Sequence, residues 1–208
     1  MTTQSTSQES KLLKSWEISP KEVKHTQSAW IVVALTLLAI ILGLVIKNSV
    51  ETATVGYEHS GVSARVPERW QVKNGFGNED PLVFSANNPL DATLSYSVFL
   101  LPSGANIKLE DLASNHNIER ARLLDGYRVL DQQQVQVAGQ DAYKVHYVFV
   151  NPGNPMQLLA VMEGVDYYFA TQPKALMMSM EDHTDLFDGA LPAFLRFVDS
   201  VKLTTGGE

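Results

Sequence analysis

The sequence predicts an α+β fold, in which an antiparallel sheet of about six strands is flanked by helices and preceded by one transmembrane helix. Three observations lead to this prediction. An apolar run near the N-terminus is long enough to cross a bilayer, later segments alternate polar and apolar residues as strands do, and two segments carry the apolar stripe of a helix. With 45% hydrophobic and 19% charged residues, the 208-residue chain has the composition of a folded protein.

The first predicted element is the membrane span. Ala29 to Ile46 contains no charged residue, and a helix of that length covers about 27 Å, close to the hydrocarbon thickness of a bilayer. A buried helix of a soluble protein would normally show a polar face, and this run shows none. We expect a helix over 20–47, capped by Ser19 and including a transmembrane span over 29–47. The expected lipid anchors are Trp30, Ile31, Leu35, Leu38, Ile41, Leu44 and Lys47.

The distribution of basic residues predicts the orientation of this span. Basic residues on the N-terminal side outnumber those after it, where Lys47 is followed by none until Arg65. We therefore expect a single-pass protein of the cell (plasma) membrane, with a cytoplasmic N-terminus and an extracytoplasmic C-terminal domain. A cleavable signal peptide is the alternative, but Glu51-Thr52-Ala53 lacks the small residues of its cleavage site. The lysines before the span are Lys11, Lys14, Lys21 and Lys24.

The N-terminal tail over 1–19 is polar in its first half, which predicts flexibility. Leu12, Leu13 and Trp16 then favour either an apolar patch on the inner membrane surface or an unstructured linker, and both interpretations stay open.

The domain after the span is predicted to begin with strands. After a linker over 48–56, alternation and turn residues predict strands at 62–66, 81–86 and 94–98. A helix is predicted over 109–124, because the leucines at 109 and 112, Ile118 and Ala121 share an apolar stripe.

The second half is predicted to be a meander of antiparallel strands that ends in a helix. One extended stretch over 127–137 reaches a turn at Gly139, and a strand over 143–149 follows. Residues 157–162 are predicted to turn at Gly164 into a strand at 167–171. An apolar stripe over 186–198 predicts the helix, which Pro192 should kink or restart.

The order of several short motifs resembles the PsbP-like family over residues 57–203. The resemblance implies an antiparallel sheet sandwiched by helices, used as a binding or assembly module rather than as an enzyme. The transmembrane anchor departs from the cleaved leader or lipidated cysteine of many bacterial relatives. The motifs are Val66-Pro67 with Trp70, Gly139 to Tyr143, Tyr167 to Thr171 and Phe197 to Val201.

Composition excludes several classes of site and partner. The chain has no cysteine, which excludes disulfides and thiolate metal ligands. From Val55 onward it has 19 acidic and 11 basic residues, so nucleic acid is not expected as a partner. The absence of cysteine and of Asn-x-Ser/Thr sites is compatible with a bacterial source.

Two groups of residues are weak candidates for metal ligands. His116 and Glu119 lie three residues apart on one face of a predicted helix, and Asp182, His183 and Asp185 form an acidic run. The sequence favours ordinary helix surface for the first group and N-terminal capping for the second. No cofactor is predicted.

Three methionines, Met177, Met178 and Met180, form a possible partner surface, because flexible thioethers suit adaptable interfaces. Methionine also fills irregular cores, and the sequence favours that alternative.

The leading functional expectation is a non-enzymatic accessory or assembly subunit. Its span would join the lipid bilayer, and its outer domain would bind an integral membrane protein complex. The alternative is a tethered module that binds a small molecule or a divalent metal. A hydrolase is a third hypothesis, but no nucleophile elbow is recognisable. The expected segments are 1–19 (tail), 20–47 (helix), 48–56 (linker), 57–203 (domain) and 204–208 (tail).

Overall fold

The computed structural model describes residues 20–51, 53–76, 80–104, 108–151, 159–171 and 174–203. Two compact units are present, the helix α1 (Pro20–Glu51) and a domain that begins at Ala53. The expected tails over 1–19 and 204–208, the apolar patch within the first and the capping by Ser19 lie outside the described residues.

Helix α1 contains the predicted apolar run. Ala29–Lys47 is long and apolar enough to cross a membrane, and none of its side chains is buried. The hydroxyl of Thr36 donates to the carbonyl oxygen of Val32 at 2.9 Å, so the polar group in this run is satisfied within the helix. The segment is therefore a candidate membrane anchor or signal sequence.

The linker expected over 48–56 divides between two elements instead. Helix α1 continues to Glu51, and strand β1 (Thr54–His59) begins three residues later. Strand β1 pairs with β2 (Val62–Pro67) from Thr54 opposite Pro67 to His59 opposite Val62, and this ladder explains why the polar stretch is extended. The short strand β10 (Lys202–Leu203) completes this three-stranded sheet.

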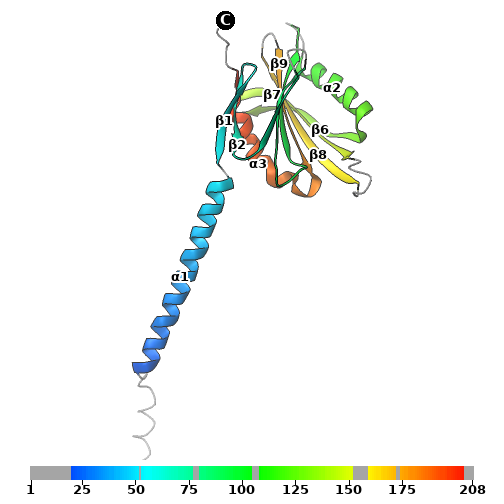
Figure 1. The fold of residues 1–208 in the computed structure, drawn as a ribbon. Coiled ribbons are helices and arrows are strands. Elements are labelled where there is room, and N and C mark those ends of the chain that lie inside the picture. Colours follow the sequence, from blue (N-terminus) through cyan, green and yellow to red (C-terminus); the bar gives the residue numbers. More distant parts are fainter. Residues whose placement is uncertain are drawn as a thin grey trace, which may run out of the picture. The chain divides into compact units, whose positions relative to one another are not determined.

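The main sheet of the domain is antiparallel and seven-stranded, in the order β3-β4-β5-β9-β8-β7-β6 (Figure 1). Strands β3 and β6 are thus its two edges. The bounds are β3 (Gln71–Asn74), β4 (Leu82–Asn87), β5 (Ser95–Pro102), β6 (Asp125–Val137), β7 (Gln140–Asn151), β8 (Ala160–Ala170) and β9 (Lys174–His183).

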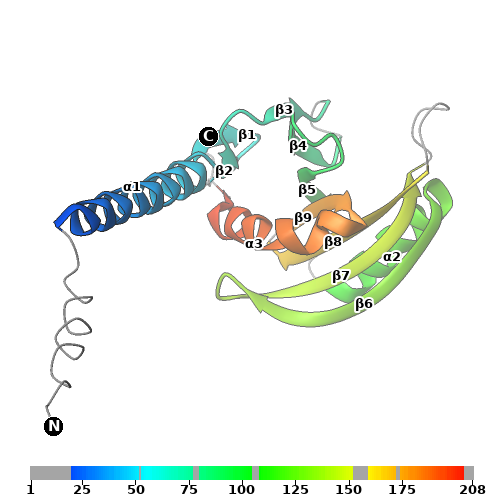
Figure 2. The same cartoon turned by 90° about the horizontal axis from the view of Figure 1, so that it is seen from below.

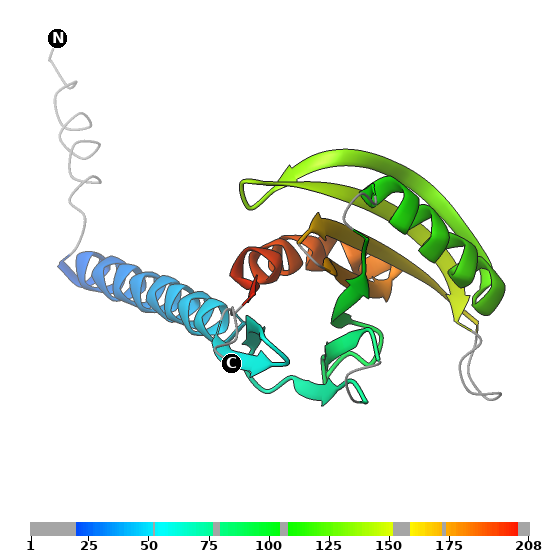
Figure 3. The same cartoon turned by 90° about the horizontal axis from the view of Figure 1, so that it is seen from above.

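The two domain helices cover opposite faces of the main sheet (Figures 2 and 3). Helix α3 (Thr184–Ser200) packs between the main sheet and β2, where Tyr96 contacts the rings of Phe194 and Phe197. Helix α2 (Leu109–Leu123) covers a second cluster, which includes Val145 and Met177. The predicted α+β class, with helices flanking an antiparallel sheet, is confirmed.

Several predicted elements differ in detail. Strand β8 runs straight through Gly164, so the predicted turn there is wrong. Strand β9, which lies in the centre of the sheet and includes the methionine-rich run 175–180, was not expected. Helix α3 continues through Pro192 without a restart. Residues 152–158, between β7 and β8, lie outside the described residues.

Candidate functional site

Helix α2 turns its polar residues toward the sheet. Arg120 is buried and Asn117 is half-buried, whereas Ile118 is 53% exposed and Ala121 is exposed. The apolar stripe predicted through Ile118 and Ala121 is therefore wrong over the second half of the helix. Its first half is as expected, since Leu109 and the next leucine, at position 112, pack on the second cluster.

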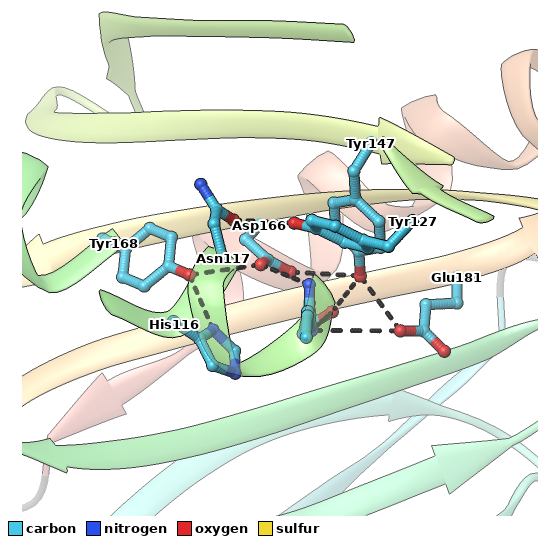
Figure 4. Close-up of polar contacts among 9 residues, drawn as sticks. His116, Asn117, Tyr127, Tyr147, Asp166, Tyr168 and Glu181 are labelled. Atoms are coloured by element: carbon cyan, nitrogen blue, oxygen red, sulfur yellow. Dashed lines mark hydrogen bonds and ion pairs between the residues drawn. The ribbon is translucent and has the colours of Figure 1, made fainter. Parts of the chain in front are cut away.

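The centre of this interface is an ion pair between Arg120 and Asp166 of β8 (Figure 4). Nη1 of Arg120 lies 2.6 Å from Oδ2 of Asp166, whose side chain has no exposed surface. Nη2 of Arg120 donates to the hydroxyl of Ser179 at 3.4 Å and lies 3.8 Å from Oε1 of Glu181. Each buried charge therefore has an opposite charge within reach, which a buried ion needs in order to be tolerated.

Tyrosines and one histidine surround this ion pair. The guanidinium of Arg120 lies 4.4 Å above the ring of Tyr147, whose hydroxyl donates to Glu181 at 3.0 Å. The hydroxyl of Tyr168 donates to Asp166 at 3.2 Å, and Nδ1 of His116 lies 2.8 Å from the same hydroxyl. These groups come from α2, β7, β8 and β9, and Figure 4 shows them joined by contacts that extend from His116 and Tyr168 to Glu181. Together they form a connected polar network.

A further tyrosine extends the network to the edge strand. The hydroxyl of Tyr127, in β6, donates to Oδ1 of Asn117 in α2 at 2.7 Å. Four strands and α2 are thus connected by hydrogen bonds through polar side chains.

The electrostatics of the network keep Arg120 and the tyrosines protonated. Burial alone would lower the pKa of Arg120, but the adjacent Asp166 carboxylate raises it well above its ordinary value. Burial and the same carboxylate raise the pKa of Tyr147 well above its usual range, and they raise that of Tyr127 to about 12. Burial, followed by the charge of Arg120, lowers the pKa of His116. These tyrosines stay protonated at neutral pH, so they are poor nucleophiles and poor bases.

The network opens toward solvent beside Glu181. An opening of about 260 Å³ is lined by Thr93, Asp125, Phe149 and Glu181, among others. Burial raises the pKa of Glu181, although Arg120 and the Tyr147 hydroxyl act in the opposite direction. The one partly exposed carboxylate of the network therefore lies at its rim.

Gly164 makes room for the ring of Tyr147. A Cβ atom at this position would lie 2.3 Å from Cζ of that ring, a distance that no packed structure accommodates. Gly164 is therefore a close-approach glycine within a strand rather than a turn residue.

The first predicted metal pair is not assembled. His116 points into the network toward Tyr168, whereas Glu119 is exposed. Among the described residues, no group of three or more His, Asp or Glu side chains is arranged to hold a metal ion.

The second predicted group joins β9 to α3. Asp182 is buried and accepts hydrogen bonds from the hydroxyl of Thr93 at 3.1 Å and from the backbone N–H of His183 at 2.7 Å. Nδ1 of His183 caps α3 by accepting from the N–H of Asp185 at 3.4 Å. The residues do surround a helix start, but the capping group is the histidine rather than a carboxylate.

The possible partner surface at Met177, Met178 and Met180 is contradicted, because all three side chains are buried. Strand β9 has neighbours on both sides and a helix on each face, so its methionines fill the core. In α1 the expected lipid anchors, from Trp30 to Lys47, are exposed.

Apart from His116, which the sequence suggested as a metal ligand, the residues of the network were not identified from the sequence. Arg120 belongs to an otherwise solvated helix pattern, and its partner lies 46 positions away. One signal was present. Asp166 interrupts the apolar stretch Gly164 to Phe169, and a lone carboxylate in a central strand requires a buried partner.

Comparison with proteins of known structure identifies the fold of the domain, whereas the sequence comparisons find no match. No protein-family model matches the chain, and no curated protein sequence matches it. Cyanobacterial PsbP (CyanoP) from Synechocystis sp. PCC 6803 is similar in structure, with a TM-score of 0.56 and 13% identity over 73% of this chain and 92% of CyanoP. LpqN of Mycobacterium tuberculosis, involved in cell envelope biogenesis, gives a TM-score of 0.45 with 13% identity over 73% of this chain and 90% of LpqN. The Saccharomyces cerevisiae Ran-binding protein Mog1p gives 0.44 with 13% identity over 73% of this chain and 96% of Mog1p.

The assignment rests on CyanoP, because the other two scores are below 0.5. The landmarks that the sequence shares with the family lie in the same domain, from Val66 in β2 to Val201 after α3. The domain that begins at Ala53 therefore has the PsbP-like fold.

Proposed function

We propose that the chain is a single-pass membrane protein whose PsbP-like domain, held outside the cytoplasm, binds a membrane protein complex as a non-enzymatic accessory subunit. The observation that carries this proposal is the run Ala29–Lys47, which is apolar on all sides and has no buried side chain. Such a surface is stable in lipid and not in water. The lysines before the run support a cytoplasmic N-terminus.

The polar network supports a binding role over a catalytic one. Its ion pair is buried and its tyrosines are held protonated, so its groups fasten α2 to the sheet. The domain shares its fold with cyanobacterial PsbP (CyanoP), and this likeness of fold is compatible with a binding module on a membrane anchor.

The alternative is a tethered module that binds a small molecule. A cleft of about 770 Å³, lined by His59, Ser60, Asp80 and Lys174 among others, gives this alternative a location. Calorimetric titration of the purified full chain in detergent with Ca²⁺, Mn²⁺ or Zn²⁺ tests whether this module binds a divalent metal. A saturable heat of binding would favour that alternative.

Single-cysteine labelling tests the orientation. Because the chain has no cysteine, Ser5→Cys and Ser114→Cys each introduce one thiol, and Ser114 is exposed on α2. A membrane-impermeant maleimide should label Ser114→Cys in intact cells and Ser5→Cys only after permeabilisation. The reverse pattern contradicts the proposed orientation.

Affinity purification tests the accessory role. The full chain, solubilised in mild detergent and purified through a C-terminal tag, should retain a stoichiometric integral membrane protein. Recovery as a free protein from several detergents would contradict an accessory subunit and leave the anchor unaffected.

A further inference from the structure

Strand β6 is a long and unpaired edge of the main sheet. In the described part of the chain its one strand neighbour is β7. Every second residue of an edge strand directs its backbone N–H and C=O away from the sheet. The opposite edge, β3, has only four residues and carries Lys73, so it is protected in the usual way.

Only the first half of β6 has irregular pairing of the kind that hinders another strand from adding to the edge. The pairing with β7 is irregular between Asp125 and Arg128 and again between Val129 and Asp131. From Asp131 opposite His146 it runs regularly to Val137 opposite Gln140. The segment 132–137, Gln-Gln-Gln-Val-Gln-Val, contains no charge, proline or bulge. This half lacks the features that normally prevent a second strand from pairing with an edge.

Grooves border this segment on both faces of the sheet. Gln134 and Gln136 line a groove of about 530 Å³ beside Lys108 and Leu109 at the start of α2. Gln133 and Val137 line another of about 460 Å³, beside Tyr167 and Leu195 of the α3 face. A strand added to β6 would direct alternate side chains toward the groove on the α2 face and toward the more apolar groove on the α3 face.

We propose that residues 132–137 pair, antiparallel, with the same residues of a second copy of this chain. In such a pair the two copies are related by a two-fold axis normal to the sheet, so residues on the α3 face of one copy oppose residues on the α3 face of the other. With the axis at Gln134, residue 132 faces 136 of the other copy and 133 faces 135. Glutamines then meet on the α2 face, and Gln133 meets Val135 on the α3 face.

Charge and side-chain chemistry favour a second copy. Only glutamines occupy the α2 face of the segment, whereas Gln133 shares the α3 face with Val135 and Val137, which border the more apolar groove. Each glutamine amide both donates and accepts, so the segment is complementary to itself. The chain has 19 acidic and 11 basic residues from Val55 onward, and this pairing brings no two charges of the segment together.

A six-residue ladder is smaller than the contact that a stable dimer in solution needs. The strength of the pairing therefore rests on the proposed membrane anchor, which raises the effective concentration of one copy around another.

Cysteine cross-linking of the full chain in membranes tests the pairing. Residues that face each other across an antiparallel pair are close enough for a disulfide, and the absence of native cysteine makes each variant unambiguous. Gln133→Cys, Gln134→Cys and Val135→Cys should give one position with at least tenfold more disulfide dimer than Gln71→Cys, which lies exposed on the opposite edge strand. The proposal is overturned if all three variants form no more disulfide dimer than Gln71→Cys does. It is also overturned if they cross-link to another protein instead.

Charged substitutions at positions 132 and 136 test, in the same cross-linking assay, which residues of the two copies face each other. If Gln134→Cys gives the peak, adding Gln132→Lys and Gln136→Lys places like charges opposite each other and should reduce the dimer at least fivefold. Adding Gln132→Lys and Gln136→Glu places opposite charges there and should restore it. Equal dimer in both variants contradicts the pairing. Fractionation separates the two proposals, because a chain that leaves the membrane fraction disproves the anchor, whereas a membrane-bound chain without cross-links disproves the pairing.

Discussion

Arg120 and Asp166 are charged residues at the centre of an interface that apolar residues usually form. Asp166 is fully buried, and the 2.6 Å ion pair replaces the water that both groups lose. Removing one partner of such a pair leaves the other charge buried and unpaired, which costs far more than an exposed ion pair is worth.

Asp166→Asn is therefore expected to lower the free energy of unfolding by about 3–5 kcal/mol. The amide keeps the shape of the carboxylate but not its charge. Urea unfolding of the full chain in detergent measures the change, with the exposed Asp188→Asn as the control. Equal stabilities of the two variants would show that the ion pair does not hold α2 on the sheet.

Replacing glycine by alanine is expected to change the free energy of unfolding in opposite directions at Gly164 and Gly189. Gly164→Ala places a Cβ within 2.3 Å of the buried Tyr147 ring and should cost about 1–3 kcal/mol. Gly189→Ala, in α3, meets no atom within 4 Å and should add about 0.5–1 kcal/mol, because glycine is a poor helix residue. The same unfolding experiment tests both, and a loss at both positions would contradict the difference in packing.

Helix α2 is held to the sheet in part by hydrogen bonds of ionisable groups, which makes its attachment sensitive to pH. Burial and Arg120 lower the pKa of His116 below its ordinary value of 6.5. As pH falls through about 6.5, the unfolded chain binds a proton at this position while the folded chain does not, so stability is lost toward acid.

His116→Asn should consequently reduce the loss of unfolding free energy between pH 7.5 and pH 5.5. The raised pKa of Glu181, which burial causes, acts in the opposite sense but is present in both chains. Urea unfolding at the two pH values provides the comparison. Parallel losses in the wild type and the variant would exclude His116 as the cause.

Two hairpins place a residue other than glycine at positive φ. Ala138 and Gly139 connect β6 to β7 with φ of 54° and 74°, and Ser60 and Gly61 connect β1 to β2 with φ of 49° and 76°. Both pairs match the two-residue turn whose first position prefers asparagine.

Ala138→Asn and Ser60→Asn are each expected to stabilise the domain by about 0.5–1 kcal/mol, because asparagine tolerates this conformation better than alanine or serine. Thermal unfolding in detergent measures both. Ala138→Val should have the opposite sign, and a stabilising valine would contradict the strain argument.

The chain as a whole joins an apolar helix to a domain with its own core. A charge in the middle of the apolar run should prevent stable insertion, since arginine at the centre of a span costs about 3 kcal/mol. Leu38→Arg is thus expected to lower the fraction of chain that remains in carbonate-washed membranes. Leu203→Arg, on an exposed position of the domain, should not lower it. Full retention of Leu38→Arg would argue against insertion.

The order of polar and apolar residues within a segment was sufficient to predict several helices and strands. The uncharged run after Ala29 predicts its helix, and the alternation of Tyr143, Val145 and Tyr147 predicts the inward face of β7, which packs against α2. The stripe over 186–198 likewise predicts the buried face of α3 through Phe187, Phe194 and Val198, although Leu186 is exposed.

The inward face of α2 and the interior position of β9 required the tertiary structure. Arg120 is buried because Asp166 lies opposite it, and the three methionines of β9 are buried because helices cover both faces of that strand. Periodicity and composition report whether a residue prefers water, and they determined the apolar helix, the fold class and most elements of this chain. Which polar residue is compensated, and which apolar residue is covered, depends on partners distant in sequence, so only the folded chain decides it.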